Sequence, residues 1–267
     1  VKKVDGGLVA NGVWSFASGG GWADWNNMQV FVPREEGGVA HHMALVPKSD
    51  YRVIDDWYSQ GMAATGSRSI ELDNVFIPKH RLLNTADARA GKNIEASENF
   101  GPIFRVPPMS GANKIFSGPV IGMARGALDA IERDLSMRNN VAGIPMATLT
   151  TAQMRVAEAG ALIEAAWALM QRDCDVALEI GKIGRLTTVD DRAFWRRNNA
   201  YAGVMCVKAV DTLHPLIGAR GLTPDSDFMR AYRDIHVATM QINMAWDRHA
   251  ITAAELQLGL PATDPRA

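Results

Sequence analysis

The sequence has little cysteine, almost no net charge and no long apolar run. Its two cysteines, Cys174 and Cys206, stand apart without CxxC spacing, so they predict reduced, buried thiols and a reducing compartment. A net charge of −1 gives no electrostatic basis for binding nucleic acid or an anionic membrane. No run of about 18 apolar residues is present, and the first residues lack an apolar signal core. We therefore expect a cytoplasmic protein with neither a membrane span nor a targeting peptide.

Several motifs of well-known binding and catalytic sites are also missing. There is no P-loop and no GxSxG nucleophile elbow. The run Gly19–Gly21 is not a dinucleotide fingerprint, because that motif needs a helix directly after it and here strands are expected on both sides. His236 and His249 share the last expected helix but are thirteen residues apart, not the four that a helical zinc site uses. No metal site is expected, and His249 fits a core histidine.

The first part of the chain has the pattern of an antiparallel β domain. Short segments rich in Val, Ile and aromatic residues recur about every ten residues with turn residues between them, as in a β-sandwich or barrel. We expect turns at Asp5–Gly7 and at Asn11–Gly12. Further strands are expected in NMQVFVP, MALVPK, YRVIDDW and SIELDNVFIP. Residues 86–108, rich in Gly, Asn, Ser and Pro, predict a connecting loop.

From residue 109 the periodicity becomes helical and predicts a four-helix bundle. Small and apolar residues step by four and three from Ala152 to Met170, which is typical of long bundle helices. The helices are expected within residues 110–140 with a late start or kink at Pro119, through 152–170, from about 190 to 213 and from about 228 to 258. The predicted fold class is α+β: a partial antiparallel β-barrel or sandwich with its connecting loop in residues 1–108, then the bundle in residues 109–267.

The stretch WSFASGGG contains the clearest candidate for a binding site. Ser18 follows a strand end beside Phe16 and Trp14, where its hydroxyl can hydrogen-bond a flat heterocycle that the aromatic rings cover. A plain flexible turn at Gly19–Gly21 is the alternative interpretation. Farther along, Arg138 closes the first long helix, where a cation either compensates the helix dipole or meets a phosphate group.

Taken together, several motifs resemble those of the acyl-CoA dehydrogenase superfamily. They are WSFASG, TGSRSIELDNVFIP, GMARGALDAIERDLSMR, GARGL and RAYRDIH, in the same order and at similar spacing. The resemblance covers nearly the whole chain. It implies a middle β domain followed by a four-helix bundle, with flavin bound between them and assembly as a homotetramer. Members also have an N-terminal helical domain, so we expect this chain to be a C-terminal fragment whose β domain is incomplete at its start.

Two branches of this superfamily are the main alternatives. Dehydrogenases use a catalytic glutamate as the base that removes the α-proton of an acyl-CoA. The resemblance places the two positions at which that glutamate occurs at Ile242 and Ala112, and neither side chain can accept a proton. An acyl-CoA dehydrogenase-like oxidoreductase is therefore the less favoured alternative. A non-catalytic relative that keeps the fold without binding flavin is another.

The motifs are more similar to those of the two-component flavin-dependent monooxygenases, such as p-hydroxyphenylacetate hydroxylase. In that branch a separate reductase supplies reduced flavin (FMNH2 or FADH2), and a flavin C4a-hydroperoxide transfers an oxygen atom to the substrate. The resemblance implies that Ser18 contacts the flavin near N5, that Phe16 packs on the flavin ring and that Arg138 meets a flavin phosphate. We therefore expect an oxygenase component that hydroxylates an aromatic or similar small molecule.

The chain departs from that branch in its last expected helix. These monooxygenases often carry a histidine five residues beyond the RDIH-like motif, and here that residue is Gln241. Glutamine donates and accepts hydrogen bonds but cannot take a proton. Either a neighbouring histidine (His236 or His249) serves instead, or the substrate needs no base, or the register differs by a few residues. Ser18, Gln241 and His236 are accordingly the expected catalytic residues, and neither the substrate nor the choice of FMN or FAD follows from the sequence.

Overall fold

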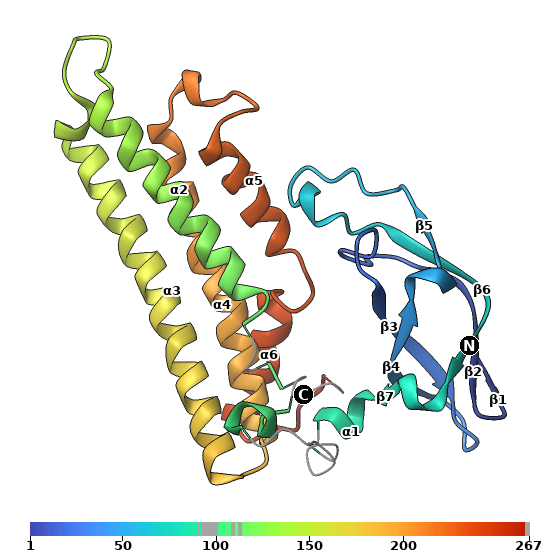
Figure 1. Cartoon of the computed structure of the whole chain (residues 1–267). Helices are drawn as coiled ribbons and strands as arrows, with labels where there is room; N and C mark the ends of the chain where they lie inside the picture. The colour runs from blue at the N-terminus through green and yellow to red at the C-terminus, as the bar shows by residue number, and fades with distance from the viewer. Residues whose placement is uncertain (90, 92–100, 108–109, 112–113, 265–267) are drawn as a thin grey trace. The chain divides into compact units, whose positions relative to one another are not determined.

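The computed structural model describes residues 1–89, 91, 101–107, 110–111 and 114–264 of the chain. The chain divides into two compact units, Val1–Phe100 and Gly101–Ala267. The first unit carries the strands and the second the long helices (Figure 1). Each unit has its own hydrophobic core. The α+β class predicted from the sequence is therefore confirmed.

The first unit consists of two antiparallel sheets. Their strands are β1 (Lys2–Val4), β2 (Gly7–Trp14), β3 (Trp25–Pro33), β4 (Val39–Pro47), β5 (Arg52–Ile54), β6 (Ser69–Pro78) and β7 (Leu82–Asn84). One sheet has the order β1-β2-β6-β5 and the other the order β3-β4-β7. Every second residue of β3 is buried, as expected for a strand with one face on a core. Apolar residues from both sheets share one core, which is the arrangement of a β-sandwich.

Two details of the first unit differ from the sequence prediction. The turn expected at Asn11–Gly12 is wrong, because β2 continues through it and its register with β6 shifts there as a β-bulge. Gly12 has a φ of +141°, a value that glycine tolerates because it has no Cβ. The segment 86–108, expected to be a loop, overlaps the short helix α1 (Thr85–Arg89) and contains a 3-10 turn at Pro102–Arg105.

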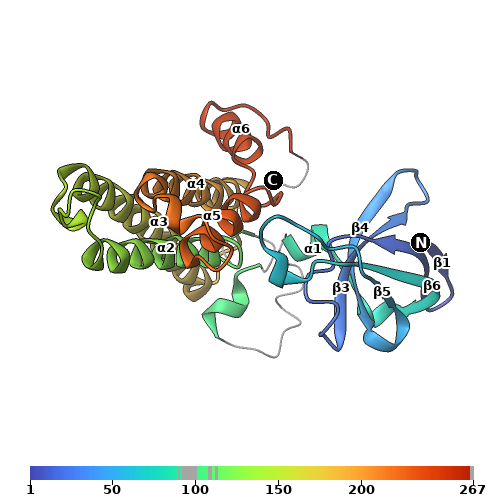
Figure 2. The same cartoon turned by 90° about the horizontal axis from the view of Figure 1, so that it is seen from above.

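The second unit is built from long helices. They are α2 (Ser117–Met137), α3 (Thr150–Ile183), α4 (Val189–Leu213), α5 (Asp227–Ala238) and α6 (Trp246–Gln257). Helices α2 to α5 lie side by side in Figure 1, and α6 lies next to α4, offset from the other four in Figure 2. Their apolar faces meet in a core that includes Ile131, Ile163 and Val210. Among the residues described, none of the helices combines the length and the apolar composition that a membrane span needs.

Local sequence explains where three of these helices begin and pack. Pro119 is the third residue of α2, in the first turn, where a missing backbone N–H costs nothing, and the late helix start is confirmed. The predicted seam of α3 is buried at Ala152, Ala159 and Ile163, which belong to the core of the second unit. Helix α4 begins with a capping box between Thr188 and Asp191.

The single helix predicted over residues 228–258 is wrong, because the chain breaks it into α5 and α6. In the break, the N–H of Asn243 donates to Oε1 of Gln241 (2.6 Å), and the N–H of Met244 donates to the carbonyl of Gln241 (2.7 Å). These short-range bonds take groups that a continuous helix would pair four residues away. The Met244 side chain is 2% exposed and packs on Gly203 of α4, where an added Cβ would lie 2.8 Å from its methyl carbon.

The two cysteines are free thiols in different surroundings. Cys206 lies in the helical core, and burial raises the pKa of its thiol to about 12. Cys174 is half-buried, and burial raises its pKa as well. The prediction of buried thiols is confirmed for Cys206 only, since Cys174 is half-buried. Deprotonation of Cys206 is strongly disfavoured near neutral pH.

A buried ion pair joins the segment before α2 to the two longest helices. The Nζ of Lys114 lies 3.1 Å from Oδ2 of Asp173 on α3, and the two side chains are 8% and 2% exposed. Nδ2 of Asn198 on α4 lies 2.9 Å from each oxygen of this carboxylate. Arg172 adds a 3.5 Å contact from the surface side. The carboxylate thus has both a counter-charge and hydrogen-bond donors, which burial of a charge requires.

Replacing Lys114 with methionine should leave the carboxylate of Asp173 buried without its main counter-charge. We expect Lys114→Met to lower the free energy of unfolding by about 3 kcal/mol. The matched control is Lys182→Met, which removes an exposed pair with Glu179 and should change stability by less than about 0.5 kcal/mol. Urea denaturation of both variants measures the difference, and equal losses would show that the buried pair is not a stabilising contact.

Candidate functional site

The loop after β2 holds Phe16 and Ser18 in a constrained conformation. Phe16 has a φ of +61°, which is rare for a bulky residue. The N–H of Ser18 donates to the carbonyl of Phe16 (2.9 Å), and the N–H of Gly19 donates to the carbonyl of Thr65 (3.1 Å). The loop is thus fastened to the segment that precedes β6. Backbone strain of this kind concentrates at functional sites, so the loop is a candidate for one.

Three hydroxyl groups form a chain of hydrogen bonds between these segments. Oγ of Ser18 lies 2.8 Å from Oγ of Ser67, which in turn lies 2.8 Å from Oγ1 of Thr65. The Thr65 hydroxyl donates to the carbonyl oxygen of Met62 at 2.7 Å. Ser18 is exposed, whereas Ser67 is only 8% exposed. The chain therefore runs from an exposed hydroxyl through the buried Ser67 to the half-buried Thr65.

Exposed aromatic rings border this hydroxyl chain. The Phe16 ring is 74% exposed and stands edge-on to Trp57, with 6.2 Å between the ring centroids. Trp22 is 71% exposed and packs over Gly66, where a Cβ would lie 2.5 Å from the indole ring. Only glycine fits at position 66, whose φ is +50°. An exposed hydroxyl flanked by aromatic rings suits a flat heterocycle with polar ring atoms, and these residues fit the ring system of a flavin.

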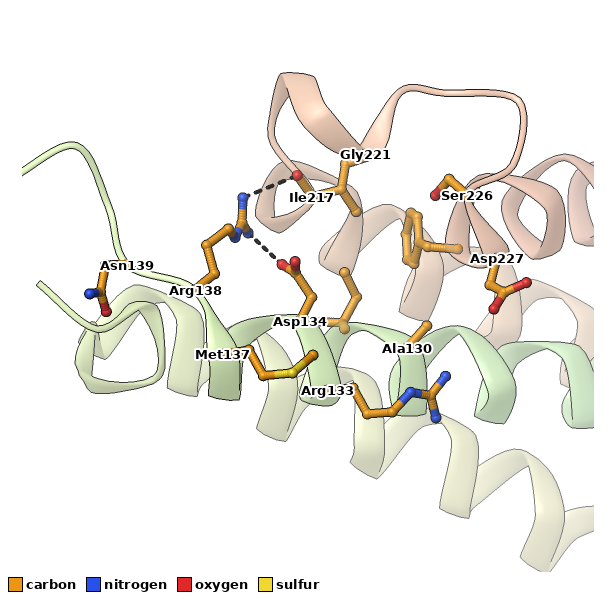
Figure 3. A pocket seen from close by; sticks show the side chains of 12 residues that line it. Ala130, Arg133, Asp134, Met137, Arg138, Asn139, Ile217, Gly221, Ser226 and Asp227 are labelled. Carbon is orange, nitrogen blue, oxygen red and sulfur yellow. Dashed lines mark hydrogen bonds and ion pairs between the residues drawn. The ribbon is translucent and has the colours of Figure 1, made fainter. Parts of the chain in front are cut away.

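Arg138 borders a cavity of about 750 Å³ at the C-terminal end of α2 (Figure 3). Its guanidinium pairs with Asp134 at 2.8 Å, and it donates to the carbonyls of Ile217 (3.2 Å) and Leu216. Arg138 therefore ties the end of α2 to the segment after α4. Arg133 and Asp227 also line the cavity. Its two arginines can contact a phosphate group, while the carboxylates of Asp134 and Asp227, which line the same cavity, offset their charge.

His236 lies in the last turn of α5 and uses both ring nitrogens within the second unit. Nδ1 is 2.8 Å from the carbonyl oxygen of Tyr232, and Nε2 is 3.2 Å from Oδ1 of Asp211 on α4. Because a carbonyl only accepts, Nδ1 carries a proton and Nε2 faces a carboxylate. Burial, and then a hydrogen bond with Asp211, raise the pKa of the Tyr232 phenol. The expected role of His236 in catalysis stays a prediction.

Gln241 lies in the break between α5 and α6, not on a helix face. Its carbonyl and side-chain oxygens are both used by the turn. His249 fastens this turn from α6, with Nε2 3.0 Å from the carbonyl oxygen of Ile242. Its ring is 6% exposed, so the prediction of a buried histidine is confirmed. Burial lowers the pKa of His249, so near neutral pH the ring is uncharged and Nε2–H donates.

Comparison with known proteins identifies the family of the chain. Residues 114–246, about half of the chain, match the family described as acyl-CoA dehydrogenase, C-terminal domain. The chain is 34% identical to the oxygenase component of FADH(2)-dependent resorcinol hydroxylase from Rhizobium sp. (strain MTP-10005), over 97% of this chain and 66% of that protein. It is 30% identical to a pigment production hydroxylase from Rhodococcus sp. (strain ATCC 21145), over 99% of this chain and 68% of that protein. The chain belongs to the acyl-CoA dehydrogenase superfamily.

Within this superfamily, the chain groups with the oxygenase components of flavin-dependent monooxygenases. The crystal structure of 3-HSA hydroxylase from Rhodococcus sp. RHA1 matches it with a TM-score of 0.90 at 27% identity, over 100% of this chain and 68% of that one. The resemblance inferred from the motifs is confirmed. The chain spans about two thirds of the length of the relatives that it matches.

The residues of the TGS motif were not among the site residues predicted from the sequence. The structure brings Thr65 and Ser67 of that motif next to Ser18, and places Trp57 beside Phe16. The sequence signal for Thr65 and Ser67 is a pair of hydroxyl residues on either side of a glycine, separated by one residue from the start of β6. Ala112, one of the two positions considered for a dehydrogenase base, lies outside the described residues, and Ile242 lies in the helix break. Among the residues that the structure describes, no group of three His, Cys, Asp or Glu side chains is placed to hold a metal ion.

The His249 contact predicts a dependence of stability on pH. The pKa of His249 is lowered below 6.5 in the folded protein, so the unfolded chain binds more protons than the folded one just below that pH. The contribution of His249 is therefore complete above pH 6.5 and is lost as the pH falls toward the folded pKa. Unfolding free energies measured from pH 7.5 to pH 5 should fall less for His249→Gln than for the parent. The control His80→Gln, at an exposed position, should keep the parent profile, and identical profiles for all three proteins would contradict the assignment.

Proposed function

We propose that this chain is part of the oxygenase component of a reduced-flavin-dependent monooxygenase that hydroxylates an aromatic or similar small molecule. The observation that carries the proposal is the exposed Ser18 hydroxyl, backed by Ser67 and Thr65 and flanked by the exposed ring of Phe16. Such a site offers one directed hydrogen bond and an aromatic face, which is what a flavin ring requires.

Bound reduced flavin would supply the electrons that activate oxygen for insertion into the substrate. The part of this chain is to bind and orient the flavin. Ser18 would contact the flavin at N5 and Phe16 would pack on its ring. Arg138 would meet a phosphate group, as its position on the 750 Å³ cavity allows. We propose FADH2 as the first form to test, because the resorcinol hydroxylase relative is FADH(2)-dependent by name.

The partners follow from the same proposal. A separate reductase would supply the reduced flavin, as expected for an oxygenase component. We also propose a homotetramer and a cytoplasmic location, and the two free cysteines fit a reducing compartment. A dehydrogenase is the less supported alternative, since Ile242 has no group that can act as a base.

The proposed function predicts that the protein delays the oxidation of bound reduced flavin by oxygen. We would mix it anaerobically with FADH2 or FMNH2, add oxygen, and follow the flavin spectrum in stopped flow. A transient absorbance species that outlives the oxidation of free flavin is expected, and Ser18→Ala should shorten its lifetime by about tenfold. Ser15→Ala, a serine three residues away, serves as the control. Oxidation at the rate of free flavin would remove the proposal.

The proposed phosphate contact of Arg138 can be separated from its structural role by the choice of ligand. Arg138→Met should weaken binding of reduced FMN or FAD by about tenfold or more, because a charge-assisted hydrogen bond is lost. Binding of reduced riboflavin, which has no phosphate, should change little. Equal losses for all three ligands in anaerobic titrations would show that Arg138 acts only by holding the end of α2.

A further inference from the structure

The hydroxyl chain from Ser18 to Met62 has a direction that its end point determines. A backbone carbonyl has no hydrogen to give. The 2.7 Å distance between Oγ1 of Thr65 and the carbonyl oxygen of Met62 therefore requires the Thr65 hydroxyl to donate. A hydroxyl has one hydrogen, so Thr65 has none left for Ser67. The direction of the first link is thus settled by chemistry alone.

The same count of hydrogens settles the other two links. Oγ of Ser67 is 2.8 Å from Oγ1 of Thr65, and because Thr65 has spent its hydrogen, Ser67 must donate. Oγ of Ser18 is 2.8 Å from Oγ of Ser67. Because the hydrogen of the Ser67 hydroxyl is already used in the bond to Thr65, Ser18 must donate to Ser67. The hydrogen of Ser18 therefore points inward along the chain. What Ser18 offers to a ligand is a lone pair, which makes it an acceptor.

The backbone keeps the partners in register. The N–H of Gly19 is bonded to the carbonyl of Thr65, so the loop after β2 and the segment before β6 stay together. Ser67 is 8% exposed, which leaves solvent little access to the middle of the chain. The carbonyl of Met62 is held as well, since it also accepts from the N–H of Thr65 (3.2 Å) and from Nε1 of Trp57 (3.2 Å). The carbonyl group of Met62, which sets the direction of the hydrogen bonds in the chain, is therefore held in place.

We infer that Thr65 and Ser67 are positioning residues that orient the Ser18 hydroxyl and thereby make the site select reduced over oxidised flavin. The inference rests on the proposed function and on Ser18 facing N5. Reduced flavin carries a hydrogen on N5, which the Ser18 lone pair accepts. Oxidised flavin has only a lone pair on N5, so two acceptors would face each other without a hydrogen between them. The site then binds the form that a reductase delivers and releases the form left after the reaction.

The test is the ratio of the dissociation constants of oxidised and reduced flavin, measured by anaerobic titration of the whole chain. Thr65→Val keeps the shape of Thr65 but removes its hydroxyl, so Ser67 can turn toward Ser18 and Ser18 can donate outward. Ser67→Ala breaks the chain one link closer to Ser18. We expect each variant to lower the ratio by about tenfold, because the freed Ser18 hydroxyl can donate to N5 of oxidised flavin and can still accept from the N5–H of reduced flavin. The midpoint potential of bound flavin should fall by about 30 mV, the equivalent of that tenfold change for a two-electron couple.

Two control variants distinguish an effect of hydrogen-bond direction from an effect of altered side-chain packing. Thr65→Ser keeps a hydroxyl that can donate to the carbonyl of Met62, and it should retain the ratio of the parent. Ser15→Ala removes a nearby hydroxyl outside the chain and should retain it as well. Circular dichroism and thermal unfolding establish that each variant is folded. Because Thr65→Val and Ser67→Ala act on different links, either one is a sufficient test if the other is not stable.

The outcomes distinguish this inference from the function on which it rests. A parent that prefers reduced flavin, with a ratio that drops in Thr65→Val and Ser67→Ala and persists in Thr65→Ser, is the expected result. A preference that stays within twofold in both disruptive variants, or that is lost equally in Thr65→Ser, overturns the inference and leaves the proposed function standing. A parent that binds neither form of flavin overturns both.

Discussion

The carbonyl oxygen of Met62 is the fixed point on which the candidate site depends. It accepts from the backbone and the hydroxyl of Thr65 and from the indole of Trp57. Through Thr65 it orients the hydroxyl chain that ends at Ser18, and through Trp57 it positions the ring that stands against Phe16. Met62 itself has a φ of +56°, a conformation that its neighbours must enforce. One acceptor thus organises both the polar and the aromatic part of the site.

The sequence predicted the elements whose signal is local and periodic. The strand pattern of the first unit and the start of α2 close to Pro119 follow from rules that act over a few residues. The prediction of a turn at Asn11–Gly12 was wrong because the same residue pair occurs in hairpin turns and in β-bulges. The pairing of β2 with β6 decides between the two. The prediction of one long last helix was wrong because the apolar period of the sequence continues through the break. The break itself is produced by short-range polar hydrogen bonds and by the packing of Met244 on α4.

The candidate site was predictable only in part, for a similar reason. Ser18 and Phe16 stood out because they follow a strand in a motif with unusual composition. Ser67 lies 49 residues away from Ser18 in the chain, and no periodic pattern in the sequence predicts their contact. The neighbours of His236 were equally hidden, since Asp211 belongs to a different helix. Residues that act by touching a partner far along the chain become visible only once the fold has brought them together.

The surroundings of Cys206 have a consequence for chemical durability. Wherever reduced flavin and oxygen meet, hydrogen peroxide is a by-product, and peroxide oxidises thiolates to sulfenic and higher acids. A thiol whose pKa is raised to about 12 is almost entirely protonated near neutral pH, and Cys206 is also fully shielded by the helical core. Cys206 can therefore fill space in the core as a small apolar residue without becoming a point of oxidative damage there.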